Sequence, residues 1–229
     1  MLCILPALGY LPAATACKPT DPAPAGDART LVKIRRLADT IAMVETQYLT
    51  NQFLIAMPGL EDPNFYHSVT YICEHNDEGA LGLVVNRPLD MQLGEILQHI
   101  HLDNAPLEAR QMPVHLGGPV QQDRGFVLHE PLGDWEATLK VTDRIGITSS
   151  IDILHAIARN EGPERVLITL GYAGWGAGQL EQEMAGNAWL SGPANPEILF
   201  QTPDEERWRA AAASLGVNLD LLSGDAGHA

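Results

Sequence analysis

Two apolar segments joined by a polar turn, within residues 68–88, constrain the fold of this chain more than any other feature. The first segment, residues 68–73, is rich in β-branched and aromatic residues. The second, residues 80–85, is a short apolar run bounded by Gly79 and Pro88. This pattern predicts a β-hairpin whose two strands lie in the core. Polar side chains gather at the ends of the hairpin, where a core element can present chemistry at its edges.

Hydrophobic periodicity and turn residues predict the other elements. In the last helix, Thr202 and Glu205 are expected to form a capping box, and Gly216 to end the helix. Because strands and helices intermix without a regular βαβ rhythm, they predict an α+β fold and not a doubly wound sheet. Strands are expected over residues 53–57, 114–116, 125–129, 138–141, 165–170, 188–191 and 198–200. Helices are expected over residues 93–100, 179–184 and 203–215, and between a Ser149 cap and Gly162.

The balance of charge restricts the partners of the chain. Its 229 residues include 14 basic and 29 acidic side chains, a net charge of −15. From Gln47 onward there are 9 basic and 25 acidic residues, a charge of −16, whereas the first 46 residues hold 5 basic and 4 acidic, a charge of +1. A domain this acidic repels a phosphate backbone, so direct nucleic-acid binding is not expected. Three cysteines do not make a disulfide framework, and they favour a reducing, cytoplasmic compartment.

The beginning of the chain differs in character from the rest. Residues 1–16 are nearly uncharged and apolar, but they lack the basic start of a signal peptide and are too short to span a bilayer. Residues 18–27 have the proline content of a linker, and residues 31–44 have the spacing of an amphipathic helix. The sequence leaves open a true extension, a signal segment for export, or a misassigned start. We expect an N-terminal extension over residues 1–46, one compact domain over 47–223 and a flexible tail over 224–229.

Five motifs follow one another along the chain. They are LTNQFLIAMP at residues 49–58, CEHN at 73–76, GLVVNRP at 82–88, HLGGP at 115–119 and GYAGWGAGQLE at 171–181. Together they resemble the YqgE/AlgH family of bacterial proteins, and the resemblance covers roughly residues 48–222. It implies a single compact α+β domain of mixed, coiled β-sheets with flanking helices. The family is historically labelled a group of transcriptional regulators and has no known biochemical role.

Polar and glycine residues of these motifs are candidates for a ligand site. Pro88 holds Arg87 extended at the end of a strand, where its guanidinium suits a carboxylate or a phosphate. An internal ion pair of Arg87 with Glu74 or Glu183 is the alternative. The glycine-rich segment 171–179 follows a strand and opens a helix, as anion-binding loops do, or it allows close packing of its aromatic neighbours. The expected ligand-binding residues are Asn76, Asn86, Arg87, Gly117, Gly118, Trp175 and Gln179.

Cys73 and His75 are the candidates for catalysis. Alternate residues of a strand point to the same face, so the thiol and the imidazole are expected to share one face, which suits a thiolate–imidazole pair. The alternative is a buried structural cysteine. Neither H-E-x-x-H nor C-x-x-C occurs, and the imidazoles of His99 and His101 point apart on a helix end, so no metal or cofactor is expected.

These observations favour a non-enzymatic binding or regulatory module for a small anionic ligand or a protein partner. The alternative is a thiol-dependent hydrolase or a redox-responsive protein that uses Cys73 and His75. The label of transcriptional regulator follows from the family resemblance alone, because the acidic composition argues against binding to DNA. No transmembrane segment is expected.

Overall fold

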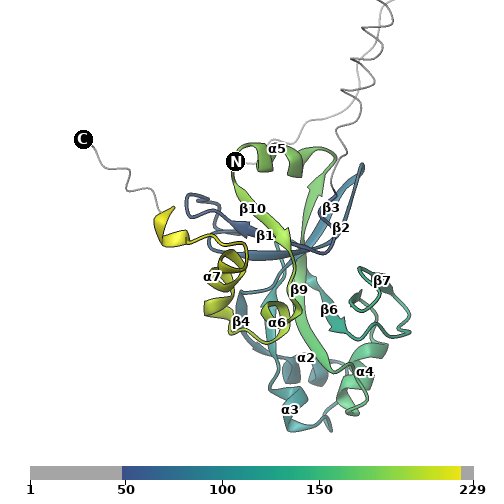
Figure 1. The fold of residues 1–229 in the computed structure, drawn as a ribbon. Helices are drawn as coiled ribbons and strands as arrows, with labels where there is room; N and C mark the ends of the chain where they lie inside the picture. Colours follow the sequence, from purple (N-terminus) through teal and green to yellow (C-terminus); the bar gives the residue numbers. More distant parts are fainter. Residues whose placement is uncertain (1–47, 223–229) are drawn as a thin grey trace, which may run out of the picture. The chain divides into compact units, whose positions relative to one another are not determined.

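The computed structural model describes residues 48–222, so the expectations for residues 1–46 and 224–229 lie outside this range. Strands and helices alternate irregularly along it, which confirms the predicted α+β class (Figure 1). The strands are β1 (Gln52–Ala56), β2 (Val69–Asn76), β3 (Gly79–Val84), β4 (Pro88–Gln92), β5 (Pro113–Leu116), β6 (Val120–Glu130), β7 (Thr138–Lys140), β8 (Gly146–Thr148), β9 (Arg165–Gly176) and β10 (Trp189–Pro193). The helices are α2 (Leu93–His99), α3 (Leu107–Arg110), α4 (Asp152–Ala158), α5 (Gln179–Ala185), α6 (Pro196–Phe200), α7 (Asp204–Ser214) and the 3-10 helix η1 (Leu219–Leu221).

The predicted hairpin is confirmed as β2 and β3, which pair antiparallel in the middle of the sheet. The strands follow the order β10-β1-β2-β3-β9-β6-β8-β7, and β4 joins the sheet through β5 beside β9. Tyr71 and Leu83 lie opposite each other and are fully buried. Helices α6 and α7 cover the face of the hairpin that carries Tyr71 and Leu83, and α5 covers the opposite face (Figure 1). Helices α2, α3 and α4 close a separate apolar cluster at the far end of β9.

Most of the glycine-rich segment, residues 171–176, is part of strand β9. The first half of β9 pairs with β5 and β6, and its second half pairs with β3 as far as Gly176. The strand expected over residues 165–170 therefore continues through the segment in which the sequence places a loop. Gly171 has a φ of 73° at the point where β9 changes partners. Glycine adopts this conformation without the steric cost that a side chain would add.

Two elements near the C-terminus differ from their predictions. The strand expected at residues 198–200 is part of α6, because Asn195 caps this helix by accepting a hydrogen bond from the Glu197 N–H and Pro196 occupies its first turn. Helix α7 begins at Asp204 without the predicted capping box. Pro203 occupies the N-cap position, and the Thr202 hydroxyl donates to the Glu197 carbonyl instead. Local capping by proline and asparagine thus outweighs the apolar pattern.

The remaining helix ends are partly as predicted. Gly216 ends α7, with a φ of 73°, and its N–H donates to the Ala213 carbonyl. Helix α4 begins at Asp152 and not directly after Ser149, whose hydroxyl accepts a hydrogen bond from Arg124. Strands β4 and β8 and helix α3 were not predicted. None of the helices within residues 48–222 has the length and hydropathy needed to cross a membrane.

Candidate functional site

Asn86 and Arg87 hold the loop that connects β1 to β2. The Asn86 amide accepts a hydrogen bond from the Val69 N–H at 2.8 Å and donates to the His67 carbonyl at 3.0 Å. The Arg87 guanidinium donates to the carbonyl oxygens of Pro63 and Tyr66, each at 2.7 Å. Arg87 therefore makes neither of the predicted ion pairs, and its two terminal nitrogens donate to carbonyl oxygens of the loop instead. Burial lowers the pKa of Arg87, and the nearby charge of Asp62 opposes this shift.

Gly117 and Gly118 lie where two backbones touch. A Cβ on Gly117 would overlap the Gly171 carbonyl, and a Cβ on Gly118 would overlap the Tyr172 carbonyl. The φ of Gly118 is 154°. Both glycines thus allow β9 to pass against the turn between β5 and β6, and this space is filled by protein backbone.

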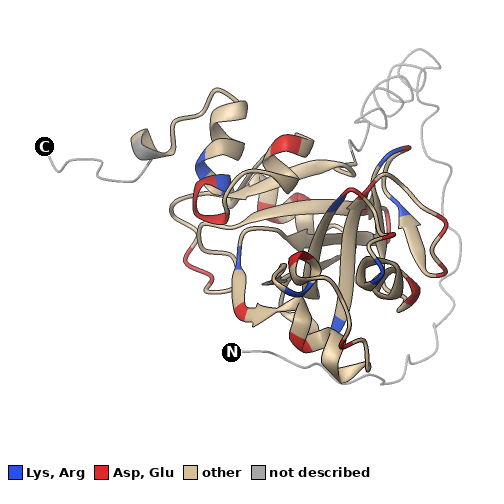
Figure 2. Cartoon of the chain, turned by 90° about the horizontal axis from the view of Figure 1, so that it is seen from below, with Lys and Arg blue, Asp and Glu red and all other residues tan. Residues whose placement is uncertain are grey.

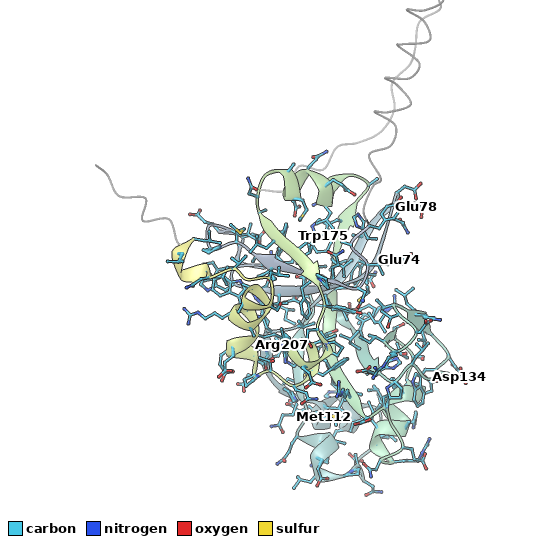
Figure 3. All side chains as sticks on the ribbon, in the orientation of Figure 1. Glu74, Glu78, Met112, Asp134, Trp175 and Arg207 are labelled. Carbon is cyan, nitrogen blue, oxygen red and sulfur yellow. The ribbon has the colours of Figure 1, made fainter. Side chains whose placement is uncertain are left out.

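Trp175 and Gln179 belong to a cluster around the Glu183 carboxylate. Glu183 Oε2 accepts the indole N–H of Trp175 at 3.0 Å and that of Trp189 at 2.9 Å, and Oε1 accepts the Gln179 amide at 3.0 Å. Phe65 stacks on Trp175, with ring centroids 6.1 Å apart. Figure 3 shows Trp175 near α5, away from Arg207 beside α7. This cluster joins α5 to the sheet.

The predicted ligand-binding residues therefore fall into separate structural groups. Asn86 and Arg87 hold the β1–β2 loop, the two glycines pack against β9, and Trp175 and Gln179 bind Glu183. The Asn76 side chain bonds within the hairpin turn, to the Glu74 carboxylate and the Glu78 N–H. The Arg87 guanidinium is directed to the β1–β2 loop, although its backbone carbonyl accepts the N–H of Leu116, which precedes Gly117.

Cys73 and His75 lie on opposite faces of β2. The register of β2 with β3 shifts between Ile72 and Glu74, so Cys73 is the extra residue of a β-bulge. Cys73 packs in the cluster under α6 and α7, whereas His75 pairs with Ala80 on the face that α5 covers. The expectation of a shared face is wrong, because a bulge reverses the alternation of a strand.

Neither group has the surroundings of a catalytic thiol or base. Burial, with a smaller contribution from the Glu74 charge, raises the pKa of the Cys73 thiol well above its usual range. His75 Nδ1 accepts the Leu49 N–H at 2.9 Å, and Nε2 lies 3.0 Å from a Glu181 carboxylate oxygen. Both ring nitrogens are therefore engaged, with the Nε2 proton donated to Glu181.

We expect alkylation of Cys73 by iodoacetamide in the native protein at pH 8 to be about 100-fold slower than that of an unfolded thiol, because the reactive species is an exposed thiolate. A variant with Cys3→Ser and Cys17→Ser leaves Cys73 as the single thiol for this measurement. The same variant in denaturant provides the reference rate. Native alkylation as fast as this reference, rising with pH around neutrality, would restore the thiol-enzyme alternative.

A buried charged network that the sequence pattern does not indicate joins α7 to the sheet. Arg207 is 5% exposed and donates to the carbonyl oxygens of Ile198, Thr202 and Val85 and to Asp204 Oδ1. Asp204 Oδ1 also lies 3.0 Å from His115 Nε2. Burial alone would raise the pKa of Asp204, but the hydrogen bond and charge of His115 and the charge of Arg207 outweigh it and hold this pKa below its usual value.

This network borders a cavity of about 500 Å³, whose wall includes Met112 and Arg207 (Figure 3). The Nδ1 atom of His115 faces the Ile168 carbonyl at 3.3 Å, so neither ring nitrogen of His115 points freely into the cavity. Arg165, also in its wall, pairs with Glu130 and Glu197. His115, Arg165, Asp204 and Arg207 of this wall are thus engaged with other groups of the protein. Within residues 48–222, no group of three acidic, histidine or cysteine side chains has the arrangement of a metal site.

Arg124 lies at an irregularity of strand β6. Val120 of β6 pairs with Tyr172 and Gly125 pairs with Leu170, so residues 121–124 together face Gly171. This wide bulge turns the Arg124 side chain over the Phe126 ring, at 5.2 Å from the guanidinium carbon to the ring centroid. Its Nη2 atom donates to the Ser149 hydroxyl at 3.0 Å.

Two adjoining cavities meet at Phe126 and Ser149, and we call them together the Arg124 groove. The smaller has a volume of about 240 Å³ and is lined by Leu81, Gln121, Arg124, Phe126, Ala137, Leu139, Ile147, Ser149 and Tyr172. The larger has a volume of about 310 Å³ and is lined by Ile96, His99, Ile100, Asp123, Gly125, Phe126, Val127, Thr148, Ser149, Ser150, Ile151, Leu154, Ile168 and Leu170. Arg124 is the single charged residue in the wall of the smaller cavity. In the sequence, Arg124 and Gly125 stand where the polar first half of β6 meets its buried second half, and this change of character is the signal that could have identified Arg124.

Comparison with known proteins places the chain among relatives of undefined function. A family model described as AlgH-like matches residues 53–220. The UPF0301 protein of Thioalkalivibrio sulfidiphilus is 60% identical over 187 residues, which cover 82% of this chain and 100% of that protein. The UPF0301 protein of Nitrosococcus oceani is 59% identical over 182 residues, 80% of this chain and 97% of that protein.

Solved structures show the same fold. The solution structure of the AlgH protein from Pseudomonas aeruginosa has 52% sequence identity and a TM-score of 0.67, and the match covers 80% of this chain and 97% of that one. A crystal structure of a Corynebacterium diphtheriae protein has a TM-score of 0.61 over 80% of this chain and 95% of that one, at 20% identity. At that identity, the second match concerns the fold alone.

Proposed function

The chain belongs to the AlgH-like family, and from the geometry of its surface we propose that it is a non-enzymatic binding module. Its site is the Arg124 groove. Its ligand is a small molecule that combines an anionic group with an apolar part. The anionic group pairs with the Arg124 guanidinium, and the apolar part enters the cavity beside Phe126.

The observation that carries this proposal is the absence of a carboxylate at Arg124. Within residues 48–222, Arg144, Arg159, Arg165 and Arg207 each form an ion pair with Asp or Glu, whereas Arg124, like Arg87 and Arg110, forms none. Of these three, Arg124 lies in the wall of the smaller, apolar cavity. Acidic residues are abundant along this domain (Figure 2). A guanidinium offers five N–H donors, and the Ser149 hydroxyl takes one of them. The remaining donors suit a carboxylate, sulfonate or phosphate of a ligand.

The apolar lining of the groove suits the apolar part of the proposed ligand. Leu81, Leu139, Ile147 and Tyr172 surround the smaller cavity, and Tyr172 meets Phe126 edge to face at 5.9 Å between centroids. An apolar group that leaves water for this cavity gains about 25 cal/mol per Å² of buried surface. The smaller cavity is apolar with Arg124 as its single charged residue, and such a combination is typical of small-molecule binding.

The state of the candidate catalytic groups favours binding over catalysis. The Cys73 thiol is buried and its pKa is raised, and the imidazole nitrogens of His75 and His115 face partners within the protein. His129 is fully buried between the Pro131 carbonyl and the Thr148 hydroxyl, and its burial lowers its pKa. A nucleophile beside a base, as covalent catalysis needs, is therefore not found among these side chains.

An Arg124→Gln variant is expected to bind the fluorescent anion 1-anilinonaphthalene-8-sulfonate about tenfold more weakly than the unmodified protein, because it loses a charge-assisted hydrogen bond. Titration followed by fluorescence gives the dissociation constants. The neutral analogue, 1-anilinonaphthalene, is expected to bind both proteins equally. Arg110→Gln is the matched control, since Arg110 is exposed on α3 and lines neither cavity.

A second variant tests the apolar half of the site. Leu139→Trp is expected to fill the smaller cavity and to weaken both dyes, because the larger side chain occupies the volume that the naphthalene ring needs. Unfolding curves of both variants verify that the fold is intact. Dye affinities that Arg124→Gln and Leu139→Trp both leave unchanged would refute the proposed site.

A further inference from the structure

The larger cavity of the Arg124 groove has an aliphatic lining. Its wall is built from residues of α2, α4, β6 and β9 and from residues next to them, and its apolar side chains are aliphatic apart from Phe126. Val127 and Ile168 of this wall are buried in the apolar cluster that α2, α3 and α4 close, whereas Ile151 is 50% exposed. The cavity therefore extends from the surface to the core of this end of the domain.

Arg124 lies at the boundary between the two cavities of the groove. Phe126 and Ser149 are the two residues that line both cavities. They are also the two residues that the Arg124 side chain contacts, since its Nη2 atom donates to the Ser149 hydroxyl and its guanidinium carbon lies 5.2 Å from the centroid of the Phe126 ring. An anionic group that binds Arg124 is therefore held where the rest of the ligand can enter either cavity.

The charges on the two sides of this boundary differ. Arg124 lines the smaller cavity, whereas its neighbour in the chain, Asp123, lines the larger one. The carboxylate of a ligand is attracted by the guanidinium and repelled by the Asp123 carboxylate. His99, also in the wall of the larger cavity, is bonded through Nδ1 to the Glu95 carbonyl. The larger cavity thus suits the uncharged part of the ligand and not its anionic group.

Gly125 leaves space at the wall of the larger cavity. It belongs to β6, and its φ is not positive. Apart from its two neighbours in the chain, the one described atom within 4 Å of an added Cβ is Leu170 Cδ2, at 4.0 Å. Neither the backbone conformation nor a crowded neighbour therefore requires glycine at this position. Glycine inside a strand often marks a place where a ligand comes close to the backbone.

We propose that the ligand of the Arg124 groove is a free, unbranched aliphatic carboxylic acid. Its carboxylate binds Arg124, and its chain passes Phe126 and Ser149 into the larger cavity beside Gly125. A chain that is one CH₂ group wide passes between these two side chains with less displacement than a ring needs. The volume of about 310 Å³ lies within the range of small-ligand sites. This inference rests on the proposed binding function of the groove and names the class of its ligand.

The test uses hexanoate, octanoate and decanoate as probes, below the concentrations at which they form micelles, with isothermal titration calorimetry of the full chain as the readout. The affinity is expected to increase about threefold for each added CH₂ group, because the chain leaves water for the cavity and loses part of its rotamer freedom. Decanoate is expected to bind Arg124→Gln about tenfold more weakly than the unmodified protein, and uncharged decanol to bind both equally.

A Gly125→Val variant tests the path of the chain. The new side chain is expected to enter the larger cavity without a clash, to weaken decanoate binding at least about tenfold and to abolish the dependence on chain length. Binding of 1-anilinonaphthalene-8-sulfonate, whose ring the smaller cavity holds, is expected to be unchanged. Gly176→Val is the matched control, because Gly176 is also an exposed strand glycine with an open Cβ position, and it lines neither cavity.

The outcomes separate this inference from the proposed function. Affinities that do not depend on chain length, or equal binding of decanoate by Gly125→Val and the unmodified protein, would overturn the aliphatic acid while the dye results for Arg124→Gln and Leu139→Trp still support the groove. Dye affinities unchanged in those two variants would refute the groove itself. Association with phosphatidylglycerol vesicles that Gly125→Val prevents would assign the cavity to the acyl chain of a membrane lipid and overturn the assignment to a free acid.

Discussion

Replacement of Arg207 by alanine is expected to lower the free energy of unfolding by about 3–5 kcal/mol, because it removes one partner of a buried ion pair and leaves the other behind. Arg207 is 5% exposed and donates to acceptors on α6, on the loop before α7 and beyond the end of β3. The variant leaves the buried carbonyl oxygens of Ile198 and Val85 without this donor. Asp204 loses the guanidinium of Arg207 and keeps its contact with His115 Nε2.

Chemical denaturation measures this loss as a lower midpoint with an unchanged slope. In a thermal scan it corresponds to a decrease of about 6–20 °C in Tm for a domain of this size. The matched control is Arg159→Ala. Arg159 is also paired with a carboxylate, but its side chain is 61% exposed and that of Glu161 is 64% exposed, so the expected cost is about 0–1 kcal/mol.

An Arg207→Lys variant keeps the measurement informative if Arg207→Ala does not fold. Lysine retains the charge near Asp204 but cannot reproduce the fork of donors that reaches three carbonyl groups. Its stability is expected to lie between those of Arg207→Ala and the unmodified protein. Equal stability of Arg207→Ala and Arg159→Ala would show that the network does not hold α7 in place.

Replacement of Gly118 by alanine is expected to cost more than about 4 kcal/mol, or to prevent folding, because the new Cβ would overlap backbone atoms of Tyr172 that cannot move aside. Gly178→Ala is the matched control. Gly178 also has a positive φ, of 71°, but no atom lies within 4 Å of the position that its Cβ would take. Its expected cost is only the strain of the left-handed conformation, about 1–2 kcal/mol.

The difference between the two glycine variants separates close packing from backbone strain. Unfolding by urea, followed by circular dichroism, gives the two free energies. If Gly118→Ala is no less stable than Gly178→Ala, then the backbone of β9 does not press on this turn. The turn would then be open to a ligand, as expected from the sequence for Gly117 and Gly118.

Several differences between the expected and the observed structure have one physical origin, which is that strand pairing depends on residues distant in the chain. The glycine-rich segment after residue 170 has the composition of a loop, yet it is paired strand because β3 supplies partners for it. The alternation that would place Cys73 and His75 on one face is interrupted by a bulge that arises from the register with β3. Both effects depend on a neighbour that the local pattern does not contain.

The local sequence pattern also does not indicate which groups the charged side chains contact. Pro88 does place Arg87 at the end of a strand, but the acceptors that meet it come from a loop about twenty residues earlier in the chain. Arg124 and Arg207 are each ordinary arginines in the sequence. One is left without a carboxylate and the other is buried beside one, and this difference depends on which residues the fold brings within reach.

The sequence by itself determined the α+β class, the central hairpin, the end of α7 at Gly216 and the membership of the family, because each depends on apolar period, on turn chemistry or on motifs in order. The tertiary structure alone decided the faces of β2, the course of β9, the separation of the predicted ligand residues and the isolation of Arg124. These features depend on contacts between residues that are distant in the chain. Such contacts are set by packing and hydrogen bonding of the whole domain and not by the preference of any one segment.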